Sequence, residues 1–97
     1  MSARRKKQVE WSRRSAQDLL GIEEYIALDN QAAADSVIAH ILERALLLES
    51  DPLLGKRRLA SPHRELVLSR FPFTIIYRLR GSRVLISRVL HQRRQFP

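Results

Sequence analysis

Apolar residues recur at helical spacing twice in the first half of the chain. The first stripe comprises Leu19, Ile22 and Ile26, widened by Leu20 and Tyr25. The second comprises Ala34, Val37, Ile38, Ile41, Leu42, Ala45 and Leu48. Steps of three and four residues are typical of amphipathic helices. Only a few residues separate the two stripes, so we expect an antiparallel helical hairpin.

Capping residues and a proline indicate where these helices begin and end. Ser12 and Asn30 each precede a helical pattern and can accept hydrogen bonds from the first free backbone amides. Asp51-Pro52 is expected to end the second helix, because proline disfavours helical geometry in the residue before it. The segment 8–11, Gln-Val-Glu-Trp, alternates in polarity and predicts a short strand before the first helix.

The period changes to two in the second half of the chain. Phe73, Ile75, Tyr77 and Leu79 alternate with Thr74, Ile76, Arg78 and Arg80, which indicates a strand with one face richer in charge. The segments "RELVLSR" and "RVLISRVL" flank it as further strands, and 51–63 reads as a loop. We therefore predict an α+β fold: an N-terminal strand, the helical hairpin packed on a three- to four-stranded, mainly antiparallel sheet, and a short C-terminal element near His91.

The composition fits one domain spanning 1–97, with 1–7 expected to be a flexible basic segment. The 97 residues are 44% hydrophobic and 29% charged, as in ordinary globular domains. The absence of cysteine excludes disulfides and thiolate metal ligands and suits a reducing compartment. No apolar run is long enough for a signal peptide or a membrane span, so a cytoplasmic protein is expected.

Charge is distributed unevenly along the chain. Residues 8–55 hold three arginines against nine carboxylates, a net charge of −6. Residues 56–97 hold Lys56 and ten arginines against Glu65 alone, a net charge of +10. This asymmetry predicts a polyanionic partner, either nucleic acid or an acidic protein segment. The excess of arginine favours recognition over mere solubility, because its planar group binds anions at two points.

Two of the three histidines are candidates for proton transfer. His40 lies within the second predicted helix and reads as a partly exposed helix residue, whereas His63 and His91 flank the predicted strands. Metal-free RNA cleavage needs an acid, a base and cations around the phosphate. His91 could supply the acid or base, and Arg64, Arg78, Arg93 or Arg94 the clamp. Alternatively these side chains only bind a partner or face solvent, and no spacing typical of a metal or triphosphate site is present.

The order of motifs resembles a known family. "VEWSRRSAQDLLGIEEYIALDNQAAADSVIAHI" followed by "LLGKRRLASPHRELVLSRFPFTIIYRLRGSRVLISRVLHQRRQFP" is similar to the RelE/ParE superfamily of type II toxin–antitoxin toxins, within its ParE-like branch. The resemblance implies a toxin neutralised by an acidic cognate antitoxin, whose C-terminal segment wraps it. ParE members are described as poisons of DNA gyrase, and RelE members cut messenger RNA on the ribosome.

The resemblance also favours one of these targets. RelE-type nucleases carry two lysines, two arginines and a tail tyrosine, and our matching places Glu65, Val67, Thr74 and Gln92 at the lysine and arginine positions. The chain reaches Pro97 about where the tyrosine would fall. We therefore expect a gyrase-binding toxin without catalytic residues, cofactor, metal, membrane or small-molecule substrate.

Two alternatives remain. One is a ribosome-dependent mRNA endoribonuclease using His91, Arg93 and His63, and the other is a basic nucleic-acid-binding module without toxicity. The candidates for binding a target or nucleic acid are Arg57, Arg58, Arg64, Arg70, Arg78, His91, Arg93, Arg94 and Phe96.

Overall fold

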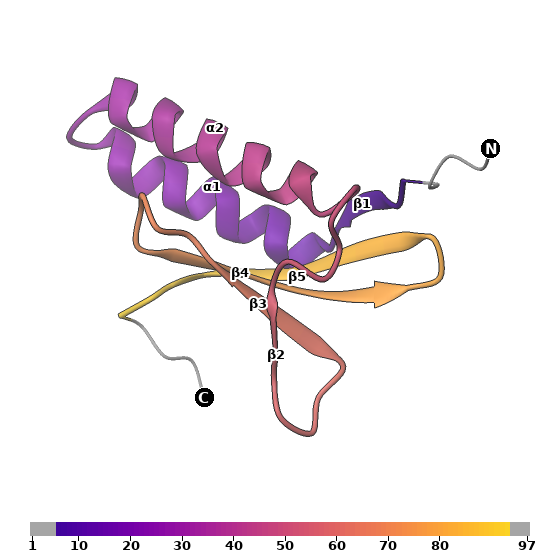
Figure 1. Ribbon diagram of the computed structural model, residues 1–97. Helices are drawn as coiled ribbons and strands as arrows, with labels where there is room; N and C mark the ends of the chain where they lie inside the picture. Colours follow the sequence, from indigo (N-terminus) through magenta and orange to yellow (C-terminus); the bar gives the residue numbers. More distant parts are fainter. Residues whose placement is uncertain (1–5, 94–97) are drawn as a thin grey trace.

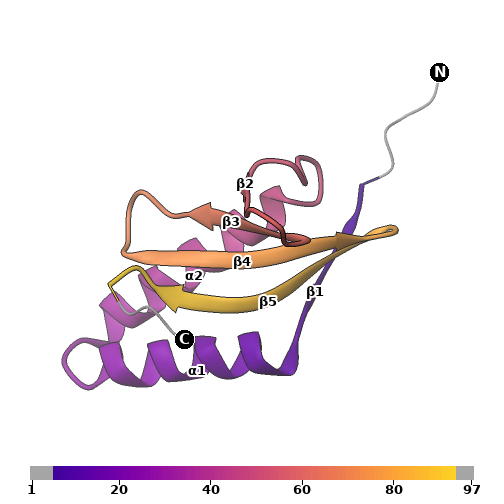
Figure 2. The same ribbon diagram turned by 90° about the horizontal axis from the view of Figure 1, so that it is seen from below.

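A computed structural model describes residues 6–93 of the chain and forms a two-layer α+β fold (Figure 1). The elements are β1 (Gln8–Trp11), α1 (Arg13–Ala27), α2 (Gln31–Leu47), β2 (Lys56–Arg57), β3 (His63–Val67), β4 (Phe73–Arg80) and β5 (Arg83–His91). One mixed sheet has the strand order β1-β5-β4-β3-β2. Both helices lie on one face of this sheet, and no helix covers the other face within the described residues (Figures 1 and 2).

Both predicted helix caps are confirmed. The Ser12 side chain accepts a hydrogen bond from the Ser15 amide, and the Asn30 side chain accepts one from the Ala33 amide, each at 3.0 Å. The second helix ends earlier than expected, at Leu47 with Leu48 as its cap, so a short turn precedes Asp51.

The predicted fold class is confirmed, but the sheet has five strands instead of three or four. The additional strand, β2, lies inside the segment expected to be a loop. Lys56 pairs with Glu65 and Arg57 with Arg64. Two residues are too few to show a period of two in the sequence. The N-terminal strand β1 forms the other edge of the sheet, where it pairs in parallel with β5.

The core lies between the helices and the covered face of the sheet. It is formed by Val37, Ile41, Ala45 and Leu48 from the α2 side, and by Leu66, Leu68, Phe73, Ile75, Tyr77, Val84, Ile86 and Val89 from the sheet side. Three residues assigned to apolar helix faces are exposed instead: Leu20 by 58%, Tyr25 by 72% and Leu42 by 40%. Each helix packs against the sheet on one side only, so only the residues at the centre of its apolar stripe are buried.

An irregularity in the β4–β5 pairing allows β5 to contribute to the core along its whole length. Ile76 pairs with Arg88 but Tyr77 pairs with Ile86, so Ser87 is an extra residue in β5. A bulge of this kind shifts the alternation of side chains by one position. Ile86 and Val89 are therefore both buried, although three positions separate them.

Candidate functional site

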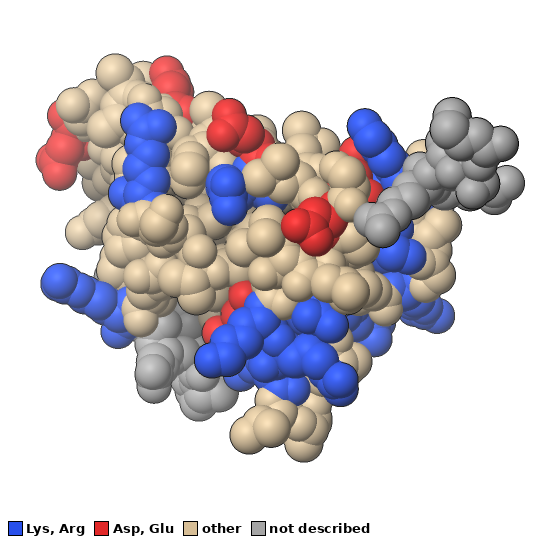
Figure 3. Space-filling model, viewed as in Figure 1, with Lys and Arg blue, Asp and Glu red and all other residues tan. Residues whose placement is uncertain are grey.

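Basic side chains gather on the sheet and acidic ones mainly over the helices. Figure 3 shows a dense group of Lys and Arg side chains beneath the sheet and most of the visible Asp and Glu side chains over the helical layer. On the face that Figure 3 shows, the fold thus gathers many basic side chains beneath the sheet, whereas the helical layer carries both acidic and basic side chains. A field of this shape attracts polyanions to the sheet side. Residues 1–5 and 94–97 lie outside the described part of the chain.

The densest basic group forms where β2 pairs with β3. Register places Arg57 opposite Arg64 on neighbouring strands, and His63 opposite Arg78 on the next strand. Lys56 and Arg57 are exposed, whereas Arg64 and Arg78 are half-buried. Four of the predicted arginines, Arg57, Arg58, Arg64 and Arg78, therefore come together with Lys56 at this end of the sheet. We call these five residues the basic edge.

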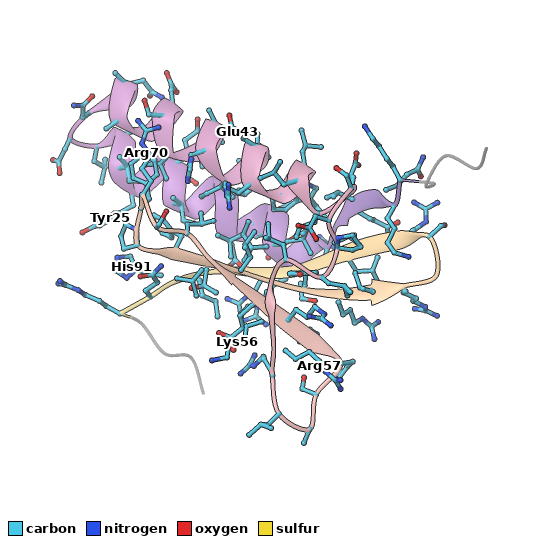
Figure 4. All side chains as sticks on the ribbon, in the orientation of Figure 1. Tyr25, Glu43, Lys56, Arg57, Arg70 and His91 are labelled. Atoms are coloured by element: carbon cyan, nitrogen blue, oxygen red, sulfur yellow. The ribbon has the colours of Figure 1, made fainter. Side chains whose placement is uncertain are left out.

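Two members of the basic edge already have intramolecular partners. Arg58 Nε lies 3.0 Å from Oε2 of Glu65, with both side chains partly exposed. Arg64 Nη1 donates a hydrogen bond of 2.9 Å to the carbonyl of Gly55. Arg64 therefore positions the backbone beneath the basic edge, while the side chains of Lys56 and Arg57 extend away from the sheet (Figure 4).

A buried tyrosine fixes the segment that leads into β2. The Tyr77 hydroxyl donates a hydrogen bond to the Pro52 carbonyl and accepts one from the Gly55 amide, each at 2.8 Å. Burial raises the pKa of Tyr77, although the hydrogen bond from the Gly55 backbone and the charge of Arg64 act in the opposite direction. A Cβ on Gly55 would lie 2.6 Å from Tyr77 Cε1, so only glycine fits this position.

Arg70, another predicted candidate, lies apart from the basic edge. It follows β3 and sits over the Phe71 ring, 5.2 Å from its centroid. The Phe71 ring in turn contacts the edge of His40 on α2, with the centroids 5.3 Å apart. Figure 4 shows Arg70 beside the helices, on the other side of the molecule from Lys56 and Arg57. The structure thus does not place Arg70 in the same site.

A cleft of about 630 Å³ opens between α1 and the end of β5. Its lining consists of Gln17, Asp18, Gly21, Ile22, Tyr25, Ile26, Phe73, Val89, His91 and Arg93. The His91 ring packs edge-on against Phe73 at 5.3 Å, and its Nδ1 accepts a hydrogen bond of 3.1 Å from the Arg93 amide. The exposure of Tyr25 beside His91 was not predicted (Figure 4). Arg94 and Phe96 lie outside the described residues.

The two histidines proposed for nuclease chemistry lie far apart. His63 pairs with Arg78 and His91 pairs with Phe73, so five positions of β4 separate them. At roughly 3.3 Å per strand residue this separation is about 17 Å, and an odd number of positions puts them on opposite faces. They cannot serve as acid and base on one phosphate. Within residues 6–93, no group of three or more potential ligand side chains could hold a metal ion.

Three of the four residues at the RelE-type nuclease positions have structural roles, and the fourth, Val67, is apolar and exposed. Glu65 pairs with Arg58, and Thr74 is buried. The Gln92 side-chain amide donates hydrogen bonds of 3.1 Å to the carbonyls of Leu68 and Phe73, linking the chain after β5 to the β3–β4 connection. None of these three side chains supplies a cation for a phosphate.

Comparisons with known proteins agree with this fold. Residues 9–96 match the family described as ParE toxin of type II toxin-antitoxin system, parDE. The chain is 34% identical over 92 residues to "Putative toxin Y4kP" of Sinorhizobium fredii, and the aligned residues cover 95% of each protein. No helix in residues 6–93 is long and apolar enough to cross a membrane.

Two solved structures share the architecture. One, described as the chromosomal ParDE TA system from P. aeruginosa, superposes with a TM-score of 0.79 and 26% identity, covering 90% of this chain and 97% of the other. The other, the RelBE2 toxin–antitoxin complex from Mycobacterium tuberculosis, has a TM-score of 0.66 and 23% identity, covering 89% and 98%, and shows similarity of fold alone. Given the family match over nearly its whole length, the chain belongs to the ParE toxin family of type II toxin–antitoxin systems.

Proposed function

We propose that this toxin inhibits DNA gyrase by binding, without a catalytic residue of its own, and that an acidic antitoxin neutralises it. Gyrase poisoning is the activity that the resemblance to ParE proteins implies. Binding alone is sufficient for such a poison, because gyrase itself cleaves the DNA. The site therefore needs a surface complementary to its target and no acid–base pair.

The distance between His63 and His91 is the observation that favours target binding over RNA cleavage as the function of this toxin. Cleavage of RNA without a metal requires proton transfer on both sides of one phosphate. The two histidines lie about 17 Å apart along β4, on opposite faces of the sheet. Buried Thr74 and the ion-paired Glu65 likewise supply no charge for a phosphate. These observations weaken the alternative of a ribosome-dependent endoribonuclease.

Two surface features support an acidic, amphipathic antitoxin segment. The helical layer leaves apolar side chains exposed, among them Leu28, Leu42 and Leu46. The sheet side presents the basic edge, which an acidic segment would neutralise. The P. aeruginosa relative is described as a ParDE system, and by this similarity the partner of the present chain would be an antitoxin of the ParD kind. A segment crossing from the helices to the sheet would cover both features.

The test measures gyrase and RNA in parallel. Purified toxin is added to gyrase, ATP and plasmid DNA, and to a translating extract containing a reporter transcript. We expect loss of supercoiling with accumulation of cleaved, linear plasmid, while the transcript stays intact. Adding the antitoxin encoded beside the toxin should restore supercoiling. Transcript cleavage with normal supercoiling would refute the proposal and select the endoribonuclease.

A further inference from the structure

The β2–β3 connection forms a narrow ribbon that projects from the sheet, away from both helices (Figure 1). Its strands are held by the Arg57–Arg64 pair and by a hydrogen bond of 3.2 Å from the Arg58 amide to the His63 carbonyl. Leu59, at the turn of the ribbon, is 98% exposed, and Ala60 adopts a positive φ of 52° that reverses the chain. Leu59 is therefore free to contact a partner at the turn of the ribbon.

The base of the ribbon is rigidly attached to the core. Tyr77 and Arg64 both bind the backbone of Gly55, immediately before β2. Because Tyr77 is fully buried, the ribbon's position is set by the core rather than by its own short ladder. A projecting element whose base is fixed loses less conformational freedom on binding than a free loop.

Cations line both sides of this ribbon. Lys56 and Arg57 are consecutive strand residues, so their side chains point to opposite faces. Arg78 lies on β4 at the ribbon's base, next to His63. Among the ion pairs of residues 6–93, the pair between Arg58 and Glu65 is the one that involves the basic edge. Lys56, Arg57 and Arg78 are thus available for an external anion.

We infer that the ribbon binds the major groove of duplex DNA, with Lys56, Arg57 and Arg78 contacting the phosphates and Leu59 contacting the base edges. The major groove, about 12 Å wide and 8.5 Å deep, admits a two-stranded β-ribbon. The loop beyond the Arg57–Arg64 pair has about three residues on each side, a reach of roughly 10 Å, which matches that depth. Cations on both faces of the ribbon can reach both walls of the groove.

The same geometry disfavours duplex RNA, because the major groove of an RNA duplex is too deep and narrow for side chains to enter. The acidic antitoxin segment of the proposed function would cover the same cations, and Leu53, Leu54 and Leu59 are exposed in and next to the ribbon. We therefore expect the antitoxin and DNA to compete for the basic edge. This inference goes beyond gyrase inhibition, and its test uses DNA without gyrase, so the two ideas can fail independently.

The experiment measures the affinity of the purified full chain for a labelled DNA duplex over a range of salt concentrations by fluorescence anisotropy. Each phosphate contact contributes about 0.9 to the slope of log affinity against log salt. Replacing Lys56→Gln and Arg57→Gln together should lower the slope by about 1.8. Leu59→Ser should weaken binding severalfold without changing the slope, because it removes no charge.

The matched control is the double variant Arg13→Gln and Arg14→Gln, which removes the same charge from exposed positions on α1. It should bind DNA with the parent slope. The inference is overturned if the parent chain fails to bind at low salt, or if the control lowers the slope as much as the ribbon variant. It is also overturned if Leu59→Ser has no effect, or if an RNA duplex or polyglutamate binds as tightly as DNA. Thermal unfolding verifies that each variant is folded.

Discussion

Asp18 on α1 and Arg88 on β5 form a two-point ion pair, with Nε to Oδ2 at 2.9 Å and Nη2 to Oδ1 at 3.2 Å. The same Oδ2 accepts a hydrogen bond of 2.9 Å from the Val89 amide. Pairing between β1 and β5 ends at Trp11 and Ile86, so at Val89 no strand supplies an acceptor. The Asp18 carboxylate supplies this acceptor and thereby links α1 to β5 of the sheet.

We predict that Asp18→Ala lowers the free energy of unfolding by about 2–3 kcal/mol, because it removes two hydrogen bonds from a half-buried guanidinium and one from a backbone amide. The hydrogen bond to Asp18 raises the pKa of Arg88, so the guanidinium is charged at every pH at which the protein would be studied. Urea unfolding at neutral pH measures the loss. Glu10→Ala removes the exposed pair with Arg83 and should cost at most about 0.5 kcal/mol. Equal losses would contradict the assigned role of Asp18.

Two glycines give a matched pair of substitutions with opposite expected signs. Alanine at Gly55 would place Cβ 2.6 Å from Tyr77 Cε1 and 2.7 Å from its hydroxyl, atoms of a buried ring that cannot move freely. Gly55→Ala should therefore destabilise the protein by about 1–3 kcal/mol. Gly21 lies in α1, where an added Cβ meets nothing within 4 Å, so Gly21→Ala should stabilise by about 0.5–1 kcal/mol. Thermal unfolding of both variants tests this, and stabilisation by both would disprove the close approach at Gly55.

The elements predicted from the sequence are those with enough residues to display a period. The two helices, with their caps Ser12 and Asn30, follow from local spacing and side-chain chemistry. The strand β2 has only two residues, and its pairing depends on distant β3. The bulge at Ser87 is likewise a property of two strands together. Such features depend on register, which no local pattern encodes.

The sequence predicts that the candidate site is basic, but it does not show which basic residues lie together. The basic half of the sequence indicates a polyanion-binding side, and Figure 3 agrees. Only the sheet register shows that Arg57 on β2 and Arg78 on β4 lie at the same end of the sheet, while Arg70 stacks on Phe71 elsewhere. The separation of His63 from His91 also depends on the strand order. The sequence shows only that both histidines flank the predicted strands, whereas the register places them on opposite faces.

Stability should fall at alkaline pH because of Tyr77. Burial raises its pKa in the folded state above the ordinary value of 10.0. The folded state therefore holds the phenol in its neutral form more strongly than the unfolded state does. The resulting contribution to the free energy of unfolding is fully present below pH 10.0 and is lost as the pH rises through the higher folded-state pKa. Tyr77→Phe should abolish this loss while lowering stability at neutral pH by about 1–3 kcal/mol, through the missing hydrogen bonds. Urea unfolding at several pH values tests both effects, and an unchanged alkaline loss in Tyr77→Phe would assign it to another group.

Growth arrest should not depend on the imidazole groups. We predict that His63→Gln and His91→Gln, separately and together, retain growth arrest on induction and gyrase inhibition in vitro, because the two side chains cannot act on a common phosphate. A nuclease using His91 as acid or base would instead lose about 10²–10⁴-fold in rate. The control is Gln92→Ala, which removes hydrogen bonds to Leu68 and Phe73 and should lower stability without a specific effect on the target. If the parent chain cleaves a transcript in a translating extract, and His91→Gln abolishes that cleavage while remaining as stable as the parent, the protein is not a purely binding toxin.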